Sequence, residues 1–227
     1  MRRLILFDID GTLVWGGPAK KAFVVALEET FGTEGAAERV SFAGKTDPQI
    51  AREILVGVGL DHAEIDRGLP ELWRRYLGHL EKGLEHLAMT VLPGVHDLLD
   101  ELAGIDDVGV GLVTGNIVGG AKLKLGSAGL WDRFGVGSYG SDHEERDELP
   151  PIALGRAREH WGRSIDPSQA VIVGDTPRDV ACGRASGMRT LAVATGLFST
   201  AELGATGADN VLADLSVTDQ VVALLTE

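Results

Sequence analysis

The sequence predicts an α/β fold in which a doubly wound parallel sheet forms the core and an α-helical cap domain is inserted after the first strand. Short apolar runs of strand length recur along the chain, and segments with helical periodicity separate them, which is typical of parallel α/β sheets. One long segment near the N-terminus has helical periodicity and few strand-like runs. We therefore expect this segment to lie outside the sheet.

The predicted strands are apolar on both faces, as expected for parallel strands that helices cover from both sides. They span residues 4–7, 108–113, 170–173, 190–194 and 210–212. Predicted helices follow or separate them at 119–128, 151–161, 178–186 and 217–225. Gly187 supplies a stop signal for the third of these helices.

The predicted insertion spans residues 18–89, so the core comprises residues 1–17 and 90–227. Apolar side chains recur at helical spacing in two parts of the insertion: Ala22, Phe23, Ala26 and Leu27, and Leu72, Trp73, Tyr76, Leu77 and Leu80. Gly16 and Gly17 precede the insertion and predict a hinge, because glycines accommodate backbone rotation.

Composition excludes several classes of partner. The 34 Asp and Glu residues exceed the 21 Lys and Arg residues, so the formal net charge is −13. We expect neither nucleic acid nor a membrane surface as a partner, because both attract clustered Lys and Arg. The single cysteine, Cys182, cannot form an intramolecular disulfide, and no run is long enough for a signal peptide or a membrane span. A cytoplasmic protein is expected.

Two acids follow the first predicted strand directly. Asp8 and Asp10 lie at positions i and i+2, just before Gly11. Carboxylates held this close repel each other and need a cation or a bound proton. Oxygen ligands of this kind suit Mg²⁺, whose coordination is often completed by a substrate phosphate. The alternative is a turn with incidental acids, and the second acidic strand end at Asp175 argues against it.

Polar residues follow three of the predicted strands, at Asp8, Thr114 and Asp175. In open parallel sheets, ligands bind beyond the carboxyl ends of the strands. Residues far apart in the sequence should therefore converge on one site at this edge.

These segments resemble the motifs of a known family. The segment 8–13, Asp-Ile-Asp-Gly-Thr-Leu, is similar to the first motif of the haloacid dehalogenase superfamily of phosphohydrolases. The segment 114–116, Thr-Gly-Asn, is similar to its second motif, and Gly174-Asp175 with Asp179 to its fourth. The resemblance covers essentially the whole chain, is closest to phosphoglycolate phosphatases, and implies a Rossmann-like core with a type 1 helical cap.

The resemblance also implies catalytic roles. Asp8 would be the nucleophile that forms an aspartyl-phosphate. Asp10 would be the general acid for the leaving alcohol and then the general base for water. Thr114 and the backbone amides of Gly115 and Asn116 would hold the phosphate oxygens.

The implied cofactor is Mg²⁺. Asp8 and Asp175 would bind it directly, Asp10 through its backbone carbonyl, and Asp179 would bind it or orient its waters. Without metal, these acids should repel a phosphorylated substrate.

The third motif of the family is a lysine, and this sequence departs from it. The matching segment, 146–152, contains no lysine, and Glu148 lies about where the lysine is expected. Arg146 is the best substitute, because a guanidinium stays charged and bridges carboxylate and phosphate. The alternatives are a solvated loop position for Arg146, or a contribution from Lys122 or Lys124, although helix lysines usually face solvent.

Lys45, in the predicted cap, is a candidate for contact with the non-reacting end of the substrate. A Schiff-base lysine of the phosphonate-cleaving type is one alternative, and it would need desolvation. A simple helix-capping turn at Thr46 or Asp47 before Pro48 is another, and it is compatible with substrate contact.

The leading hypothesis is a Mg²⁺-dependent phosphatase acting on a small phosphorylated metabolite, as a monomer or homodimer. Asp10 favours phosphate chemistry over dehalogenation, because a halide leaves without a proton. One alternative is a phosphosugar mutase of the β-phosphoglucomutase type. A receiver-like signalling module is further from the pattern, because receivers need no cap and carry their phosphorylated aspartate on a later strand. A non-catalytic binding protein is the remaining alternative, since the third motif is irregular.

Overall fold

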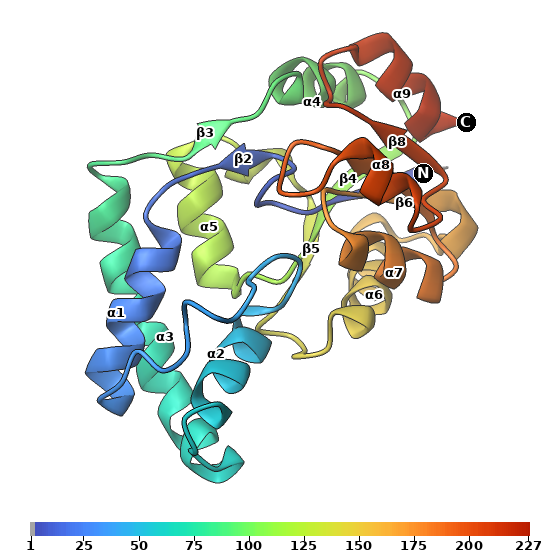
Figure 1. Cartoon of the computed structure of the whole chain (residues 1–227). Coiled ribbons are helices and arrows are strands. Elements are labelled where there is room, and N and C mark those ends of the chain that lie inside the picture. The colour runs from blue at the N-terminus through green and yellow to red at the C-terminus, as the bar shows by residue number, and fades with distance from the viewer. Residues whose placement is uncertain (1–2) are drawn as a thin grey trace.

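The computed structural model describes residues 3–227 and contains a six-stranded parallel sheet (Figure 1). Across the sheet the strands lie in the order β5-β4-β1-β6-β7-β8. Their bounds are β1 Arg3–Phe7, β4 Val108–Thr114, β5 Val136–Tyr139, β6 Ala170–Gly174, β7 Arg189–Val193 and β8 Asn210–Leu212. This topology confirms the predicted doubly wound α/β fold class.

The register brings three strand ends to one edge. Phe7 at the end of β1 pairs with Leu112 of β4 and Val173 of β6. Because all three strands are parallel, the residues that follow them leave the sheet at the same edge. The convergence predicted from the sequence is therefore present.

Alternate side chains of each strand pack against helices on opposite faces. Ile5 and Phe7 of β1 belong to the larger core cluster, whereas Leu4 and Leu6 belong to a second cluster with α6 (Leu149–Trp161). The other helices of the sheet are α4 Val95–Ala103, α5 Val118–Ser127, α7 Pro177–Ala185, α8 Thr200–Gly204 and α9 Thr218–Thr226. The sheet is thus covered on both faces, which explains its apolar strands.

Three further helices lie to one side of the sheet (Figure 1). They are α1 Ala19–Phe31, α2 Asp47–Val56 and α3 His62–Leu84. The chain enters them through β2 (Val14–Trp15) and leaves through β3 (Thr90–Val91), and these two short strands pair antiparallel. We call this helical segment, residues 18–89, the cap segment.

The cap segment has an aromatic centre. The Phe23 ring of α1 lies 5.3 Å from the Tyr76 ring of α3 and 5.6 Å from the Phe42 ring, centroid to centroid. Both contacts are edge-to-face, the geometry that aromatic quadrupoles favour. The helical periodicity that predicted this segment corresponds to a buried face shared by α1 and α3.

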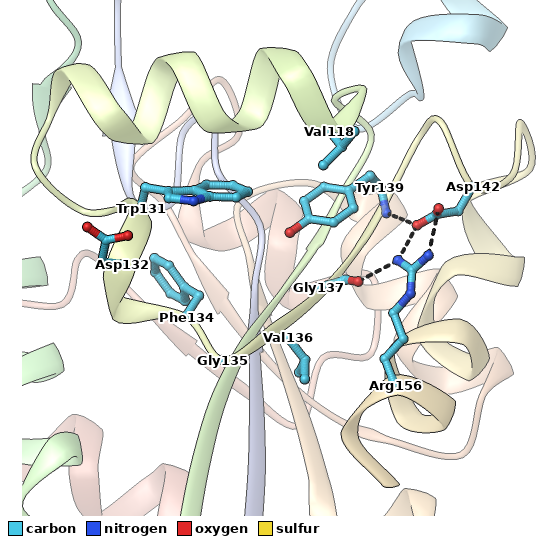
Figure 2. Close-up of a pocket in the computed structure, with 10 residues that line it drawn as sticks. All are labelled: Val118, Trp131, Asp132, Phe134, Gly135, Val136, Gly137, Tyr139, Asp142 and Arg156. Carbon is cyan, nitrogen blue, oxygen red and sulfur yellow. Dashed lines mark hydrogen bonds and ion pairs between the residues drawn. The ribbon is translucent and has the colours of Figure 1, made fainter. Parts of the chain in front are cut away.

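The edge strand β5 lay outside the predicted strands, because its Val-Gly-Ser-Tyr sequence is short and weakly apolar. Figure 2 shows how its outer edge is covered: Arg156 donates to the Gly137 carbonyl at 2.7 Å, and Asp142 accepts the Tyr139 amide at 2.9 Å. Arg156 and Asp142 also form a two-pronged ion pair. Backbone groups that another strand would use are thereby occupied by side chains.

Residues 3–227 contain no helix whose length and apolar character would let it cross a bilayer.

Candidate active site

Three carboxylates meet beyond the carboxyl ends of β1 and β6. Asp8 follows β1, Asp175 follows β6, and Asp179 lies in the first turn of α7. One oxygen from each lies within 4.8 Å of the others, and all three residues are buried. The geometry matches the side-chain cluster predicted for a metal.

Glycines leave room around Asp175. A Cβ atom at Gly11 would lie 2.3 Å from Asp175 Oδ2, and one at Gly196 would lie 1.7 Å from the same oxygen. Gly11 also adopts a φ of +85°, which disfavours other residues. Thr12 Oγ1 lies 3.5 Å from Asp175 Oδ1. Only glycine at these two positions allows the loops to approach this carboxylate.

Arg146 is the cation of this cluster. It lies in a short 3-10 helix, Arg146–Glu148, and is 5% exposed. Its Nη2 atom lies 3.1 Å from Asp8 Oδ1 and also pairs with Asp179 Oδ1. The predicted substitute for the third-motif lysine therefore reaches Asp8, and the alternative of a solvated loop residue is wrong.

Two other atoms of Arg146 extend this arrangement. Nη1 donates to the Gly44 carbonyl in the cap segment at 3.3 Å. Nε is buried and has no hydrogen-bond partner. A buried guanidinium donor without a partner is costly, and an anionic oxygen at the site would satisfy it.

A second polar network surrounds Asp10. Its Oδ2 atom accepts hydrogen bonds from Asn116 Nδ2 at 2.8 Å and from Lys124 Nζ at 2.6 Å. Asn116 also donates to Thr114 Oγ1 at 2.9 Å and accepts from Lys124 at 2.6 Å. The side chain of Asp10 is 44% exposed, whereas that of Lys124 is 6% exposed. Asp10 is held in place yet remains accessible from the cavity.

Lys124 is one of the two lysines considered as alternatives that could reach the site, and the structure brings it there although helix lysines usually face solvent. The residue follows Ile117 by seven positions and Ala121 by three, so it lies on the buried face of α5. Lys122, the other lysine considered, is exposed. The helical period of the apolar residues was the signal that could have identified Lys124.

Burial and crowding shift the pKa values of the acids. Burial raises the pKa of Asp8 to about 6, and Arg146 opposes the shift. Burial also raises the pKa of Asp175 to about 9, with further contributions from the Asp179 and Asp8 charges. Neither shift would persist beside a bound cation.

The donor set fits Mg²⁺. All candidate side-chain ligands are carboxylate oxygens, and the three carboxylates face a single guanidinium among the residues that the structure describes. Such an excess of negative charge suits a hard dication. The two oxygens of Asp179 already bond Arg146 and Thr176, so Asp179 fits the second predicted role, orientation, better than direct ligation.

The loop before α2 rests on the second motif. The Asp47 amide donates to the Gly115 carbonyl at 2.7 Å, and the Ile117 amide donates to Asp47 Oδ2 at 2.8 Å. A Cβ atom at Gly115 would lie 2.0 Å from the Lys45 carbonyl, so this approach requires glycine. Thr46 caps α2 by accepting from the Gln49 amide, and its hydroxyl donates to the Glu144 carbonyl.

A cavity of about 380 Å³ lies between the two polar networks and the cap segment. Asp8, Asp10, Thr114, Asn116 and Arg146 line it on the core side. On the cap side its lining includes Lys20, Phe23, Phe42, Lys45, Asp47, Ile50 and Tyr76. Lys45 reaches the cavity as predicted, and its ammonium pairs with Glu53. Asp47 and Tyr76 were not predicted as site residues.

Comparison with known proteins adds the decisive observation: a family model described as haloacid dehalogenase-like hydrolase matches residues 2–187. The chain belongs to the haloacid dehalogenase-like hydrolases. This confirms the family, and with the phosphatases among its relatives it confirms the enzyme class predicted from the motifs.

Curated relatives of this haloacid dehalogenase-like hydrolase include phosphatases. A phosphoglycolate phosphatase of Chromobacterium violaceum is 30% identical over 218 residues, which cover 94% of each chain. An N-acetylmuramic acid 6-phosphate phosphatase of Pseudomonas aeruginosa is 31% identical over 201 residues, which cover 86% of this chain and 82% of the relative.

Solved structures share the fold at lower identity. A predicted phosphoglycolate phosphatase from Haemophilus somnus superposes with a TM-score of 0.71 at 19% identity, covering 97% of each chain. A β-phosphoglucomutase from Clostridium difficile gives a TM-score of 0.70 at 15% identity, covering 98% of this chain and 96% of that one. At these identities the likeness concerns the fold alone.

Proposed function

We propose that this hydrolase is a Mg²⁺-dependent phosphatase that cleaves a small phosphate monoester through an aspartyl-phosphate on Asp8. The observation that carries the proposal is the surroundings of Asp8: its carboxylate pairs with Arg146, lies within metal-ligand distance of Asp175 and Asp179, and lines the same cavity as Asp10. The names of the curated relatives, several of them phosphatases, support the same chemistry.

Asp8 would begin the reaction. Its carboxylate oxygen attacks phosphorus in line with the leaving oxygen, so that an O–P bond forms as the ester O–P bond breaks. Asp10 donates a proton to the departing alcohol. Arg146, the Thr114 hydroxyl and the amides of residues 115 and 116 bind the non-bridging oxygens as their charge redistributes.

Hydrolysis of the aspartyl-phosphate reverses these roles. Asp10, now a carboxylate, takes a proton from a water that attacks phosphorus, and the bond to Asp8 breaks to release inorganic phosphate. Mg²⁺ held by Asp8, Asp175 and the Asp10 carbonyl, with Asp179 orienting its waters, would offset the negative charge that the acids and the phosphate bring together.

The test is a panel of phosphorylated metabolites assayed with Mg²⁺ and with EDTA, ranked by kcat/KM. We expect release of inorganic phosphate that EDTA abolishes and Mg²⁺ restores. Thermal unfolding provides an independent readout, because Mg²⁺ should raise the Tm by binding the native carboxylates. Turnover that persists fully in EDTA would contradict the metal assignment.

The same panel distinguishes phosphatase from mutase. A mutase would return the phosphoryl group to a sugar hydroxyl, so a hexose 1-phosphate would yield its 6-phosphate rather than free phosphate. We expect free phosphate.

A further inference from the structure

The cap side of the cavity would receive the alcohol portion of the substrate, because Asp8 and Arg146, which would hold the phosphoryl group, belong to the core side of the lining. Its wall is largely apolar: Phe23, Phe42 and Ile50 line it beside Tyr76. Aromatic faces of this kind pack against the C–H surface of a carbon skeleton. The wall accepts a leaving group without requiring it to be charged.

The cations that line the cavity are already engaged. Lys124 pairs with Asp10, Arg146 with Asp8 and Asp179, and Lys45 with Glu53. Lys20 is exposed and lies 5.3 Å above the Phe42 ring. Among residues 3–227, no lining cation is both buried and without a carboxylate partner. A carboxylate on the leaving group would find no free buried counterion.

Asp47 adds a negative charge at the same place. It is 9% exposed; its amide donates to the Gly115 carbonyl, and its carboxylate accepts from the Ile117 amide. Burial raises its pKa to about 6, with Lys124 and Asp10 as the charges that face it. Near neutral pH the group is therefore mostly ionised, and the nearest cation is shared with Asp10.

Tyr76 supplies a complementary donor. It is 2% exposed, and its hydroxyl makes no hydrogen bond to the residues that the structure describes. Burial and the neighbouring charges of Asp47 and Asp10 raise its pKa, so the phenol keeps its proton. A hydroxyl on the leaving group could accept from Tyr76 and donate to Asp47.

We infer that the substrate has a neutral, hydroxyl-bearing leaving group, and that Asp47 determines specificity by rejecting leaving groups that carry a carboxylate. This inference rests on the proposed phosphatase function and names the substrate class for the same site. The discriminating contact is repulsive: an anionic leaving group meets a buried carboxylate, whereas a hydroxyl meets a hydrogen-bond acceptor.

The experiment uses two substrates of equal carbon number, 2-hydroxyethyl phosphate and 2-phosphoglycolate, assayed with Mg²⁺ at pH 7.5. We expect kcat/KM to favour the hydroxyethyl ester by about tenfold or more, because like charges at close range are costly. In Asp47→Asn, phosphoglycolate should gain, chiefly through a lower KM, and the ratio should fall toward one. The asparagine keeps an oxygen to accept the Ile117 amide.

Asp132→Asn is the matched control, since Asp132 is an exposed acid of the core and should leave the ratio unchanged. Tyr76→Phe gives a second measurement that should reduce turnover of the hydroxyethyl ester while sparing phosphoglycolate. A native preference for phosphoglycolate, or an unchanged ratio in Asp47→Asn, would overturn the inference and leave the phosphatase function standing. Absence of turnover for every monoester would overturn both.

Discussion

The two halves of the site are each built around one buried cation, and they use it differently. On the phosphate side, Arg146 joins two carboxylates, Asp8 and Asp179, and a cap carbonyl. On the leaving-group side, Lys124 binds one carboxylate, Asp10, and the amide oxygen of Asn116. A planar guanidinium can bridge several acceptors in fixed directions, whereas an ammonium acts as a compact charge.

The two sides also differ in the number of acids that surround the buried cation. Three acids gather around Arg146 on the phosphate side. Burial raises the pKa of Asp175 there to about 9, and the charges of Asp179 and Asp8 add to the shift. On the other side, Lys124 pairs with Asp10, and Asp47 is one further acid. The cluster of three acids suits a dication on the phosphate side, whereas Lys124 holds the Asp10 carboxylate in the position from which it would exchange a proton with the leaving group.

The largest effect is expected for Asp8→Asn, which removes the nucleophile from the phosphate side. Turnover of 4-nitrophenyl phosphate with Mg²⁺ should fall by about 10³-fold or more, because the amide cannot form the covalent intermediate. Loss of ³²P labelling of the denatured protein after brief incubation with labelled substrate is the direct measurement. A variant that retains full turnover would show that Asp8 is not the nucleophile.

Arg146 should come next. Arg146→Met should lower kcat/KM by about 10²–10³-fold, because the phosphate loses a charged donor as its oxygens gain charge. Arg146→Lys keeps the positive charge but lacks the planar set of donors of a guanidinium, so its kcat/KM should lie between those of Arg146→Met and the native enzyme. If Arg146→Lys matched the native enzyme, the geometric contrast between the two cations would be irrelevant to catalysis.

The Arg146 variants also need a stability control, because removing one partner of a buried ion pair leaves the other uncompensated. Urea unfolding with and without Mg²⁺ separates the two effects. A catalytic role for Arg146 requires that Arg146→Met show this loss of kcat/KM under conditions in which the variant is still folded.

Lys124 allows a sharper test of the leaving-group side. Lys124→Met should reduce kcat by about tenfold for alkyl phosphates, since Asp10 loses the cation that holds it, and much less for 4-nitrophenyl phosphate, which needs no general acid. Lys122→Met on the same helix is the matched control. An equal loss for both classes of leaving group would indicate that Lys124 serves only the folding of the site.

The sequence predicted those site residues whose positions follow from a strand end, and it did not predict contacts between loops that are distant in the sequence. Asp8, Asp10 and Asp175 follow strands and Thr114 ends one, so local pattern and parallel topology were enough to bring them together. Arg146 required the further assumption that a basic residue fills the third-motif position. The sequence could nominate it, but its contacts with Asp8 and Gly44 depend on how distant loops pack.

Lys124 and Asp47 illustrate what local pattern leaves out. A lysine on a helix costs little in solvent and much when buried, so burial is the unusual outcome and needs the Asp10 and Asn116 partners to be known. Asp47 fits a simple helix start, which is true of its backbone, and yet its side chain reaches across to Ile117. Tertiary contacts between the cap segment and the core decide both.

The smallest predicted effect concerns stability at Asp47. Its pKa lies near 6 in the folded chain and near 3.8 otherwise, so the native state binds more protons between these pH values. Native stability should therefore fall as pH rises through this window, and Asp47→Asn should escape that fall. The free-energy advantage of Asp47→Asn over the native chain should grow by about 1 kcal/mol between pH 5 and pH 8.

Urea unfolding of both proteins in EDTA measures this difference, and taking it between the two variants cancels the contributions of Asp8 and Asp175, whose pKa values are also raised. Asp132→Asn should give a difference that does not change with pH. If the advantage of Asp47→Asn instead shrank toward pH 8, the carboxylate would be stabilised as an anion, with Lys124 serving Asp47 more than Asp10. Asp47 would then be a neutralised partner of Lys124 rather than the uncompensated buried acid on which the selectivity of the leaving-group side depends.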